Sequence, residues 1–216
     1  MQQTKLMIVD DHPLVRNGLR QLLETESDFI VSAEAESISQ AINILEKTVP
    51  DVVIIDLSLP DGNGLELIRR IAIRHPEIGI LVSSMHDEDL FAERAFLAGA
   101  NGYINKQEAS EKVILALRQI LNGETYMSEK LSAKRILEQT NGADNHRNQT
   151  AEEQLSNREI EVFELIGHGM STSEIAAKLH LSIKTIESHR ANIKTKLGLT
   201  SSGELIRSAV QWTLDS

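Results

Sequence analysis

The sequence predicts an α/β domain with a doubly wound, five-stranded parallel sheet, followed by an all-α domain of four helices. Two observations support this fold class. Short apolar runs alternate five times with amphipathic stretches as far as about residue 122, whereas the last part of the chain shows only helical patterns. A length of 216 residues with 41% hydrophobic content allows two cores. We therefore expect a first domain over residues 1–122, a linker over 123–150 and a helical domain over 151–216. The linker should hold a short helix at Leu131–Leu137, followed by a polar, flexible stretch.

The spacing of apolar residues predicts the strands and helices of the first domain. Val52–Ile55 is an unbroken β-branched run, as expected for a strand buried on both faces of a sheet. The predicted strands are Leu6–Val9, Phe29–Val31, Val52–Ile55, Ile80–Val82 and Tyr103–Ile104. The predicted helices are Leu14–Leu23, Ile38–Leu45, Leu65–Ile73, Leu90–Leu97 and Val113–Leu121. In the first helix we expect one buried face, made of Leu14, Gly18, Leu19, Leu22 and Leu23.

Carboxylates follow two of these strands at the point where each strand ends. Asp56 comes directly after the third strand, and Asp10 and Asp11 come after the first. Because these two strands lie side by side in a doubly wound sheet, the three acids should meet at its carboxyl edge. A cation would neutralise them, and oxygen ligands suit Mg2+. The alternative, acids that merely cap helices, explains Asp11 before Pro13 well but explains Asp56 poorly.

Lys106 ends the last predicted strand, from which its ammonium can reach the same edge. On the residues alone, a solvated surface lysine is an equally good interpretation. Five separate signals then stand in a specific order and spacing. They are Asp10-Asp11, then Asp56, then Pro60 with Gly64, then Ser83-Ser84 after Gly79–Val82, and finally Gly102–Lys106.

This order resembles the receiver domain of two-component response regulators, which has a flavodoxin-like fold. The resemblance implies that a sensor histidine kinase phosphorylates Asp56 and that Lys106 contacts the phosphoryl group. It also implies that the hydroxyl of Ser84 hydrogen-bonds the phosphoryl group. Tyr103 would be the aromatic residue whose rotamer follows the position of this hydroxyl, so that Ser84 and Tyr103 act as switch residues. The implied Mg2+ ligands are the side chains of Asp10, Asp11 and Asp56 and the backbone carbonyl of Ser58.

The last part of the chain predicts a helix-turn-helix. Ser156 with Glu159 forms a capping-box pattern, Ser171 begins a second, short helix, and Ser182 caps a third, longer one. A tight connection at His180-Leu181 joins the last two. A fourth helix carrying Trp212 should pack on this bundle.

The distribution of charge predicts nucleic-acid binding for one part of this segment only. Residues 150–216 hold seven basic and nine acidic side chains, so this domain is not basic as a whole. Between residues 178 and 198, however, Glu187 is the single acid, and a solvated helical face would have more of them. The five basic residues there predict a surface for DNA phosphates: Lys178, Lys184, Arg190, Lys194 and Lys196.

Several motifs of this segment resemble the LuxR-type helix-turn-helix: Leu155–Val162, Gly169–Ser171, Glu174–Ala176, Thr185-Ile186, His189 and Lys196–Gly198. With the receiver, the chain resembles transcription factors of the NarL/FixJ class. This implies that Glu187, Ser188 and Ala191 face base edges, with Thr185 and His189 also on the DNA-binding helix. It further implies homodimers on promoter half-sites, with phosphorylation controlling dimerisation and promoter binding. The implied dimer contacts are Glu204–Trp212 and the first or fourth helix of the receiver.

Other classes fit the sequence less well. A haloacid-dehalogenase-type phosphatase also phosphorylates an aspartate at a strand end, but it needs a second acid where this chain has Ser58. A dinucleotide-binding domain lacks its glycine motif after the first strand. The chain has no cysteine, which excludes disulfides and thiolate metal sites. With neither a signal-peptide pattern nor a membrane-length apolar run, we expect a cytoplasmic phosphoacceptor that at most catalyses its own phosphorylation and dephosphorylation.

Overall fold

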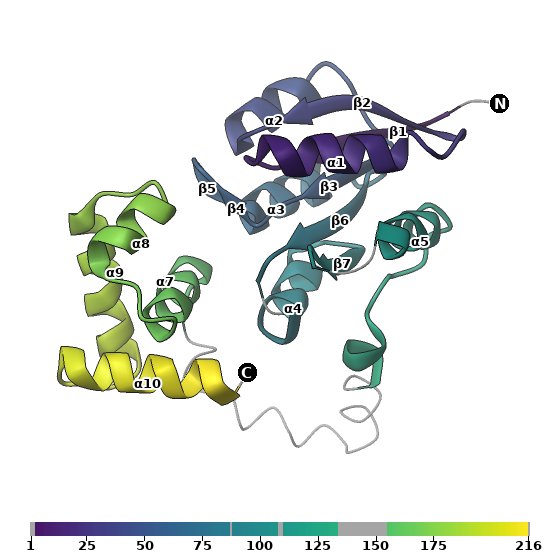
Figure 1. Cartoon of the computed structure of the whole chain (residues 1–216). Helices are drawn as coiled ribbons and strands as arrows, with labels where there is room; N and C mark the ends of the chain where they lie inside the picture. Colours follow the sequence, from purple (N-terminus) through teal and green to yellow (C-terminus); the bar gives the residue numbers. More distant parts are fainter. Residues whose placement is uncertain (1–2, 87, 108–109, 134–154, 216) are drawn as a thin grey trace. The chain divides into compact units, whose positions relative to one another are not determined.

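A computed structural model describes residues 3–86, 88–107, 110–133 and 155–215 of the chain. The chain divides into two compact units, residues 1–135 and 136–216, whose elements are labelled in Figure 1. None of the helices within the described ranges is long and apolar enough to cross a membrane.

The first unit contains a five-stranded parallel sheet, as the sequence predicts, with the first and third predicted strands side by side. The strand order is β2-β1-β3-β6-β7. Helices α1 and α5 lie on one face of the sheet and α2, α3 and α4 on the other (Figure 1). The strands of this sheet are β1 (Thr4–Val9), β2 (Phe29–Ala35), β3 (Val52–Ile55), β6 (Gly79–Ser84) and β7 (Gly102–Asn105). The helices are α1 (Pro13–Leu23), α2 (Ile38–Leu45), α3 (Gly64–Arg74), α4 (Glu88–Ala98) and α5 (Ser110–Leu121).

Two features of the strands were not predicted by the apolar runs of the sequence. Strand β2 extends to Ala35 although its apolar run stops at Val31, because it is an edge strand and tolerates half-exposed polar residues. A small antiparallel hairpin, β4 (Ser58–Leu59) and β5 (Gly62–Asn63), follows the loop after Asp56.

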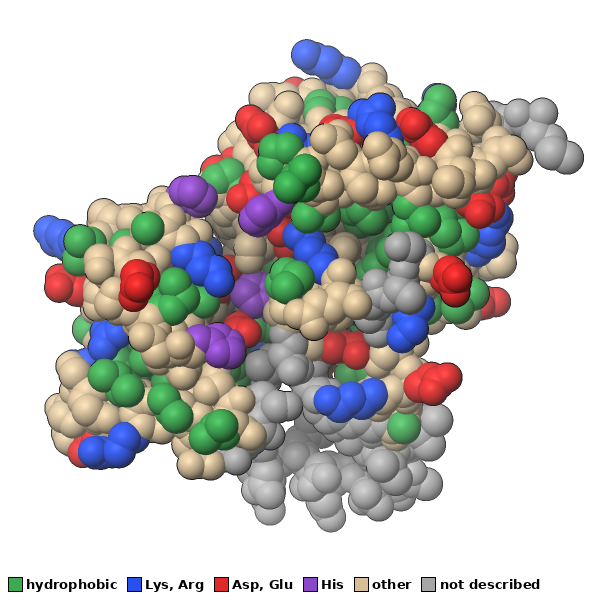
Figure 2. All heavy atoms as spheres, viewed as in Figure 1, with side chains coloured by type: hydrophobic (Ala, Val, Ile, Leu, Met, Phe, Trp, Pro, Cys, Tyr) green, Lys and Arg blue, Asp and Glu red, His purple; other side chains and the backbone are tan. Residues whose placement is uncertain are grey.

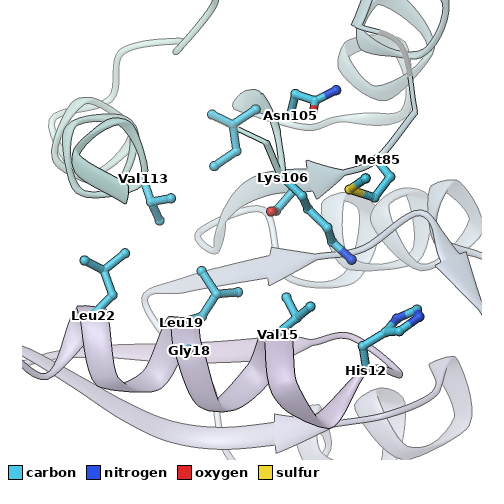
Figure 3. Close-up of a pocket in the computed structure, with 11 residues that line it drawn as sticks. His12, Val15, Gly18, Leu19, Leu22, Met85, Asn105, Lys106 and Val113 are labelled. Carbon is cyan, nitrogen blue, oxygen red and sulfur yellow. The ribbon is translucent and has the colours of Figure 1, made fainter. Parts of the chain in front are cut away.

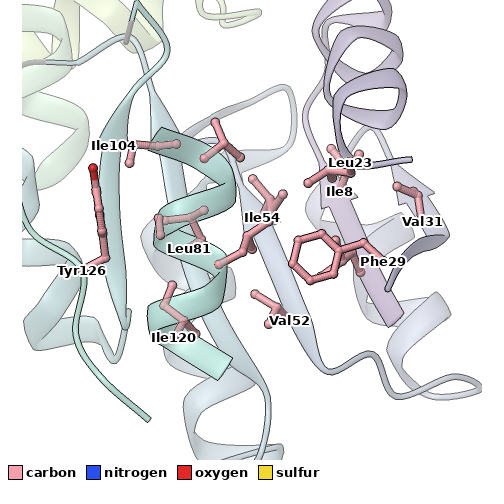
Figure 4. Packing of buried hydrophobic residues seen from close by; sticks show 14 residues of the cluster. Ile8, Leu23, Phe29, Val31, Val52, Ile54, Leu81, Ile104, Ile120 and Tyr126 are labelled. Carbon is pink, nitrogen blue, oxygen red and sulfur yellow. The ribbon is translucent and has the colours of Figure 1, made fainter. Parts of the chain in front are cut away.

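One hydrophobic cluster fills the space between the sheet and the α1 and α5 helices (Figure 4). Ile8, Ile54 and Leu81 contribute from three neighbouring strands, and Leu23 and Ile120 contribute from the two helices. Burying each such side chain stabilises the fold by about 1.5–3 kcal/mol. The cluster thus fixes the strands whose ends carry the predicted acids.

The prediction of a single buried face on α1 was wrong. Leu23 is fully buried, but Leu19 and Leu22 are only partly buried, Gly18 is exposed and Leu14 is 86% exposed. Leu14 and Leu23 are nine residues apart, about two and a half helical turns, so they lie on opposite sides of the helix. Helix α1 therefore keeps an exposed apolar side.

The segment after α5 remains attached to the sheet of the first unit. Gly123 has a φ of +80°, which a residue with a Cβ rarely adopts, and it turns the chain at the end of α5. Tyr126 donates its backbone N–H to the Asn101 carbonyl at 2.9 Å and is buried beside Gly102. Of the short helix predicted at Leu131–Leu137, residues 131–133 are helical, whereas the rest of it and the polar part of the predicted linker lie outside the described residues.

The second unit is helical, with α7 (Asn157–Gly167), α8 (Thr172–Lys178), α9 (Ile183–Lys196) and α10 (Ser202–Asp215). The predicted caps are confirmed, since Ser156 and Ser171 form capping boxes and the Ser182 hydroxyl accepts the backbone N–H of Thr185. His180 turns the chain between α8 and α9 with a φ of +52°. These two helices form the expected helix-turn-helix.

Helices α7 and α10 pack closely in this unit. A Cβ added to Gly167 would lie 2.6 Å from the Ala209 backbone oxygen, so only glycine allows this approach. The rings of Phe163 and Trp212 meet with centroids 5.4 Å apart. This contact fixes α10 against the first helix of the bundle.

Candidate functional site

Strand register brings Asp10 and Asp56 together. Val9 pairs with Ile55, so the two aspartates each follow a paired strand end. The Asp56 backbone N–H donates to the Val9 carbonyl at 2.8 Å. Both side chains are almost fully buried.

Lys106 completes this pocket from the end of β7. Its ammonium lies 2.7 Å from Asp10 Oδ2 and 2.6 Å from Asp56 Oδ2, and Figure 3 shows the side chain extending along the strand ends. Its backbone N–H donates to the Ser84 carbonyl at 2.9 Å, which anchors the residue to β6. Lys106 therefore lies in the acidic pocket and not on the solvated surface.

The pocket shifts the pKa values of Asp56 and Lys106. Burial raises the pKa of the Asp56 carboxyl, Lys106 opposes that shift, and Asp10 adds to it, so the pKa stays above its ordinary value. Burial lowers the pKa of Lys106, but the carboxylates of Asp56 and Asp10 outweigh this effect and raise it overall. Lys106 is therefore a permanent cation beside Asp56.

The acids at this edge also fit a metal ion. Asp10, Asp11, His12 and Asp56 each offer one ligand atom, and these atoms lie within 4.8 Å of one another. Asp11 Oδ1 is buried and accepts no hydrogen bond from the described residues, and its 2.7 Å contact with His12 Nδ1 is an ion pair only when that ring is protonated. One ammonium cannot neutralise three carboxylates, so the oxygen-rich donor set suits Mg2+. His12 was missing from the predicted metal ligands, although its position next to the acid pair was a signal.

The predicted switch residues lie next to this pocket. Ser84 and Tyr103 are fully buried, and both hydrogen-bond to the backbone of His86. The Ser84 hydroxyl accepts the His86 N–H at 3.2 Å, and the Tyr103 hydroxyl donates to the His86 carbonyl at 3.0 Å. Ser58 begins the β4 strand two residues after Asp56.

A groove of about 480 Å3 lies between α1 and α5 and reaches Lys106 (Figure 3). Val15, Leu19 and Leu22 line it from α1, and Val113 lines it from α5. This groove explains why Val15, Leu19 and Leu22 are only partly buried, whereas the exposed Leu14 lies outside it.

The second unit presents part of the predicted DNA surface outward. Basic and acidic side chains are mixed over its visible face (Figure 2), in keeping with a domain that is not basic as a whole. The predicted contacts that are exposed are Lys178, Lys184, Glu187, Ser188 and Ala191, and Arg190 and Lys194 are half-buried.

Two other predicted DNA contacts, Lys196 and Thr185, have partners within their own unit, and a third, His189, is half-buried. The Lys196 ammonium lies 2.6 Å from Glu159 Oε2, and the hydroxyl of Thr185 shares a 2.7 Å hydrogen bond with Ser182 at the helix cap. His189 is half-buried, and burial and the neighbouring Arg158 lower its pKa. Lys196 therefore also connects α9 to α7.

The chain matches two family models. The one described as "Response regulator receiver domain" matches residues 6–118, and the one described as "Bacterial regulatory proteins, luxR family" matches residues 153–209. The chain therefore belongs to the DNA-binding response regulators of two-component systems, which are phosphoacceptors and not enzymes. Within them it has the receiver and LuxR-type arrangement of the NarL/FixJ class.

Curated and solved relatives match nearly the whole chain. Oxygen regulatory protein NreC of Staphylococcus aureus (strain bovine RF122 / ET3-1) is 37% identical over 210 residues, which cover 96% of this chain and 97% of that protein. A Salmonella typhimurium RcsB structure is 31% identical with a TM-score of 0.67, covering 98% of each chain. RcsB from Salmonella enterica serovar Typhimurium, bound to promoter rprA in the presence of phosphomimetic BeF3-, is 32% identical with a TM-score of 0.61 and covers 95% of this chain and 98% of that chain.

Proposed function

We propose that Asp56 accepts a phosphoryl group from a sensor histidine kinase and that this controls promoter binding by the second unit. The observation that carries the proposal is the buried carboxylate of Asp56 at a strand end, with an ammonium and two further acids beside it. A carboxylate oxygen of Asp56 attacks the phosphorus, and the donor's leaving group departs on the opposite side.

Lys106 neutralises negative charge on the transferring group, since its ammonium already lies at the oxygens of Asp10 and Asp56. Asp10, Asp11, Asp56 and the Ser58 carbonyl would hold Mg2+, which supplies further charge neutralisation. His12 joins this set as a contact of Asp11. Mg2+ removal should therefore stop phosphorylation.

Labelling with acetyl phosphate tests the phosphoacceptor. With Mg2+ the wild-type protein should gain one phosphoryl group, as measured by intact-protein mass, whereas Asp56→Asn should gain none. Asp51→Asn is a matched control. Asp51 lies directly before β3, at the end of the strand away from Asp56, and accepts a hydrogen bond from the Lys5 N–H. Labelling of Asp56→Asn equal to that of the control would refute the assignment.

Ser84 and Tyr103 connect this site to the rest of the receiver in the proposed mechanism. A phosphoryl oxygen on Asp56 attracts the Ser84 hydroxyl and pulls the loop after Ser84 inward. The side chain of Tyr103 can then turn toward the sheet. Ser84→Ala should keep Asp56 labelling but lose most of the phosphorylation-dependent gain in DNA affinity. An undiminished gain would remove Ser84 from the mechanism.

We further propose that the protein binds DNA as a homodimer, in the cytoplasm where the chromosome lies. One recognition helix makes few base contacts, so two copies on neighbouring half-sites bind much more tightly. Helix α10 offers a contact, since Ile206, Val210 and Leu214 form an exposed apolar stripe at helical spacing. Sedimentation of phosphorylated Val210→Glu on DNA should show a monomer, and an unchanged dimer would exclude α10.

A further inference from the structure

The backbone of His86 is hydrogen-bonded to two neighbouring strands of the receiver, β6 and β7. Its backbone N–H donates to the Ser84 hydroxyl at 3.2 Å. Its carbonyl accepts the Tyr103 hydroxyl at 3.0 Å and the Asn105 amide at 3.4 Å. The connection between β6 and α4 is therefore held at one residue by both strand β6 and strand β7.

The side chain of His86 adds a contact to the loop after Asp56. Its Nε2 shares a 2.9 Å hydrogen bond with the Ser58 hydroxyl, from a residue 28 positions away in the chain. The ring stacks on Phe91 of α4, with centroids 4.4 Å apart and an interplanar angle of 26°. Because Phe91 is fully buried, this stacking fixes the direction in which the imidazole points.

We propose that the hydrogen bond between His86 and Ser58, the Ser58–His86 bridge, holds the β6–α4 connection in its unphosphorylated position. His86 is thus a positioning residue that acts through Ser84 and Tyr103. This inference rests on the proposed function, because it assigns the bridge to the resting state of that switch. When the Ser84 hydroxyl moves to a phosphoryl oxygen, the His86 backbone moves with it and the bridge breaks.

The bridge should therefore bias the equilibrium between the resting and active arrangements. Losing one neutral hydrogen bond of the resting state shifts this equilibrium about fivefold towards the active one. Phosphorylation and DNA binding both favour the active arrangement. An unphosphorylated protein without the bridge should therefore bind DNA more tightly and be phosphorylated faster, each by a similar factor. Affinity after phosphorylation should change little, because the bridge is already broken.

Three variants of the full chain distinguish an effect of the Ser58–His86 hydrogen bond from an effect of the packing of the ring on Phe91. His86→Phe keeps the ring on Phe91 but loses the hydrogen bond, and Ser58→Ala removes the other partner while keeping its backbone carbonyl. His86→Gln retains a side-chain amide that can reach the Ser58 hydroxyl. The probes are acetyl phosphate with Mg2+ and a DNA duplex selected by the wild-type protein from random sequences.

His86→Phe and Ser58→Ala should each raise the DNA affinity of the unphosphorylated protein about fivefold. The double variant should have the same affinity as each single variant. The affinity of His86→Gln should resemble that of the wild type. The initial rate of Asp56 labelling should rise by a similar factor. Unchanged basal affinity, or additive effects in the double variant, would overturn the bridge. A wild type that takes no label would instead refute the proposed function, and a His86→Phe variant that fails to fold leaves Ser58→Ala to decide.

Discussion

The ammonium of Lys106 lies 2.6 Å from Asp56 Oδ2, with both side chains less than one-tenth exposed. Removing one partner of a buried ion pair costs about 3–5 kcal/mol, because the remaining charge loses its neutraliser. Here the cost falls on Asp10 as well, since the same ammonium contacts both carboxylates.

Lys106→Met should lower the free energy of unfolding of the receiver by about 3 kcal/mol in a chelator. Added Mg2+ should stabilise this variant more than the wild type, because no ammonium competes for the carboxylate oxygens. Urea unfolding with and without Mg2+ measures both effects. Lys47→Met, at an exposed position, should change stability by less than about 0.5 kcal/mol, and an equal loss in both variants would contradict the prediction.

Two glycines of the receiver should respond oppositely to the same change. A Cβ at Gly64 would lie 2.3 Å from the Asp56 backbone oxygen, so Gly64→Ala must displace the chain around Asp56 and should cost about 1–3 kcal/mol. A Cβ at Gly18 has nothing within 4 Å, so Gly18→Ala in α1 should stabilise by about 0.5–1 kcal/mol. Thermal unfolding of the two variants gives both signs directly.

The stability of the second unit should depend on the protonation of His189. Burial first, and then Arg158, lower its pKa in the folded state, although Glu159 and Glu161 act in the opposite direction. The unfolded chain therefore takes up the proton first, at about pH 6.5. Stability should be full above that value and fall as the pH decreases through the folded pKa.

Calorimetry between pH 7.5 and 5.5 should accordingly show a falling midpoint for the second unit. His189→Gln cannot take up this proton and should flatten the dependence in that window. A wild-type midpoint that stays constant would show that the ring is protonated equally in both states.

Two residues of α9 should affect DNA binding in different ways. Lys194→Ala should weaken binding to all sequences alike and reduce the slope of affinity against salt by about one, as expected for a phosphate contact. Ser188→Ala should change the preferred site instead. The Ser188 hydroxyl donates to the Lys184 carbonyl at 3.0 Å, so a base must compete with that bond. Site selection that changed for Lys194→Ala and not for Ser188→Ala would mean that the helix is rotated.

Local and periodic signals were sufficient for most of the fold. The run Val52–Ile55 matches β3 residue for residue, and the Ser156–Glu159 capping box forms as its spacing predicts. Both depend on neighbours within a few residues, which the sequence displays. Parallel pairing then places Asp10 beside Asp56 without further information.

Contacts between distant segments were harder to predict. The pairing of Lys196 with Glu159 joins residues 37 positions apart, and a run of basic residues looks the same whether or not one of them has an internal partner. The Ser58–His86 bridge depends on how two loops approach, which hydrophobic period does not encode. The exposed side of α1 differs from the prediction because Leu14 and Leu23, nine residues apart, lie on opposite sides of the helix and cannot both face the sheet.

The packing of Trp212 on Phe163 gives this protein an optical property. Trp212 is the only tryptophan of the chain, and it belongs to the second unit. Indole fluorescence therefore reports on that unit alone, whereas circular dichroism records the helices of both. A denaturant titration followed by the two signals together shows, without any label, whether the receiver and the DNA-binding unit unfold as one body or in succession.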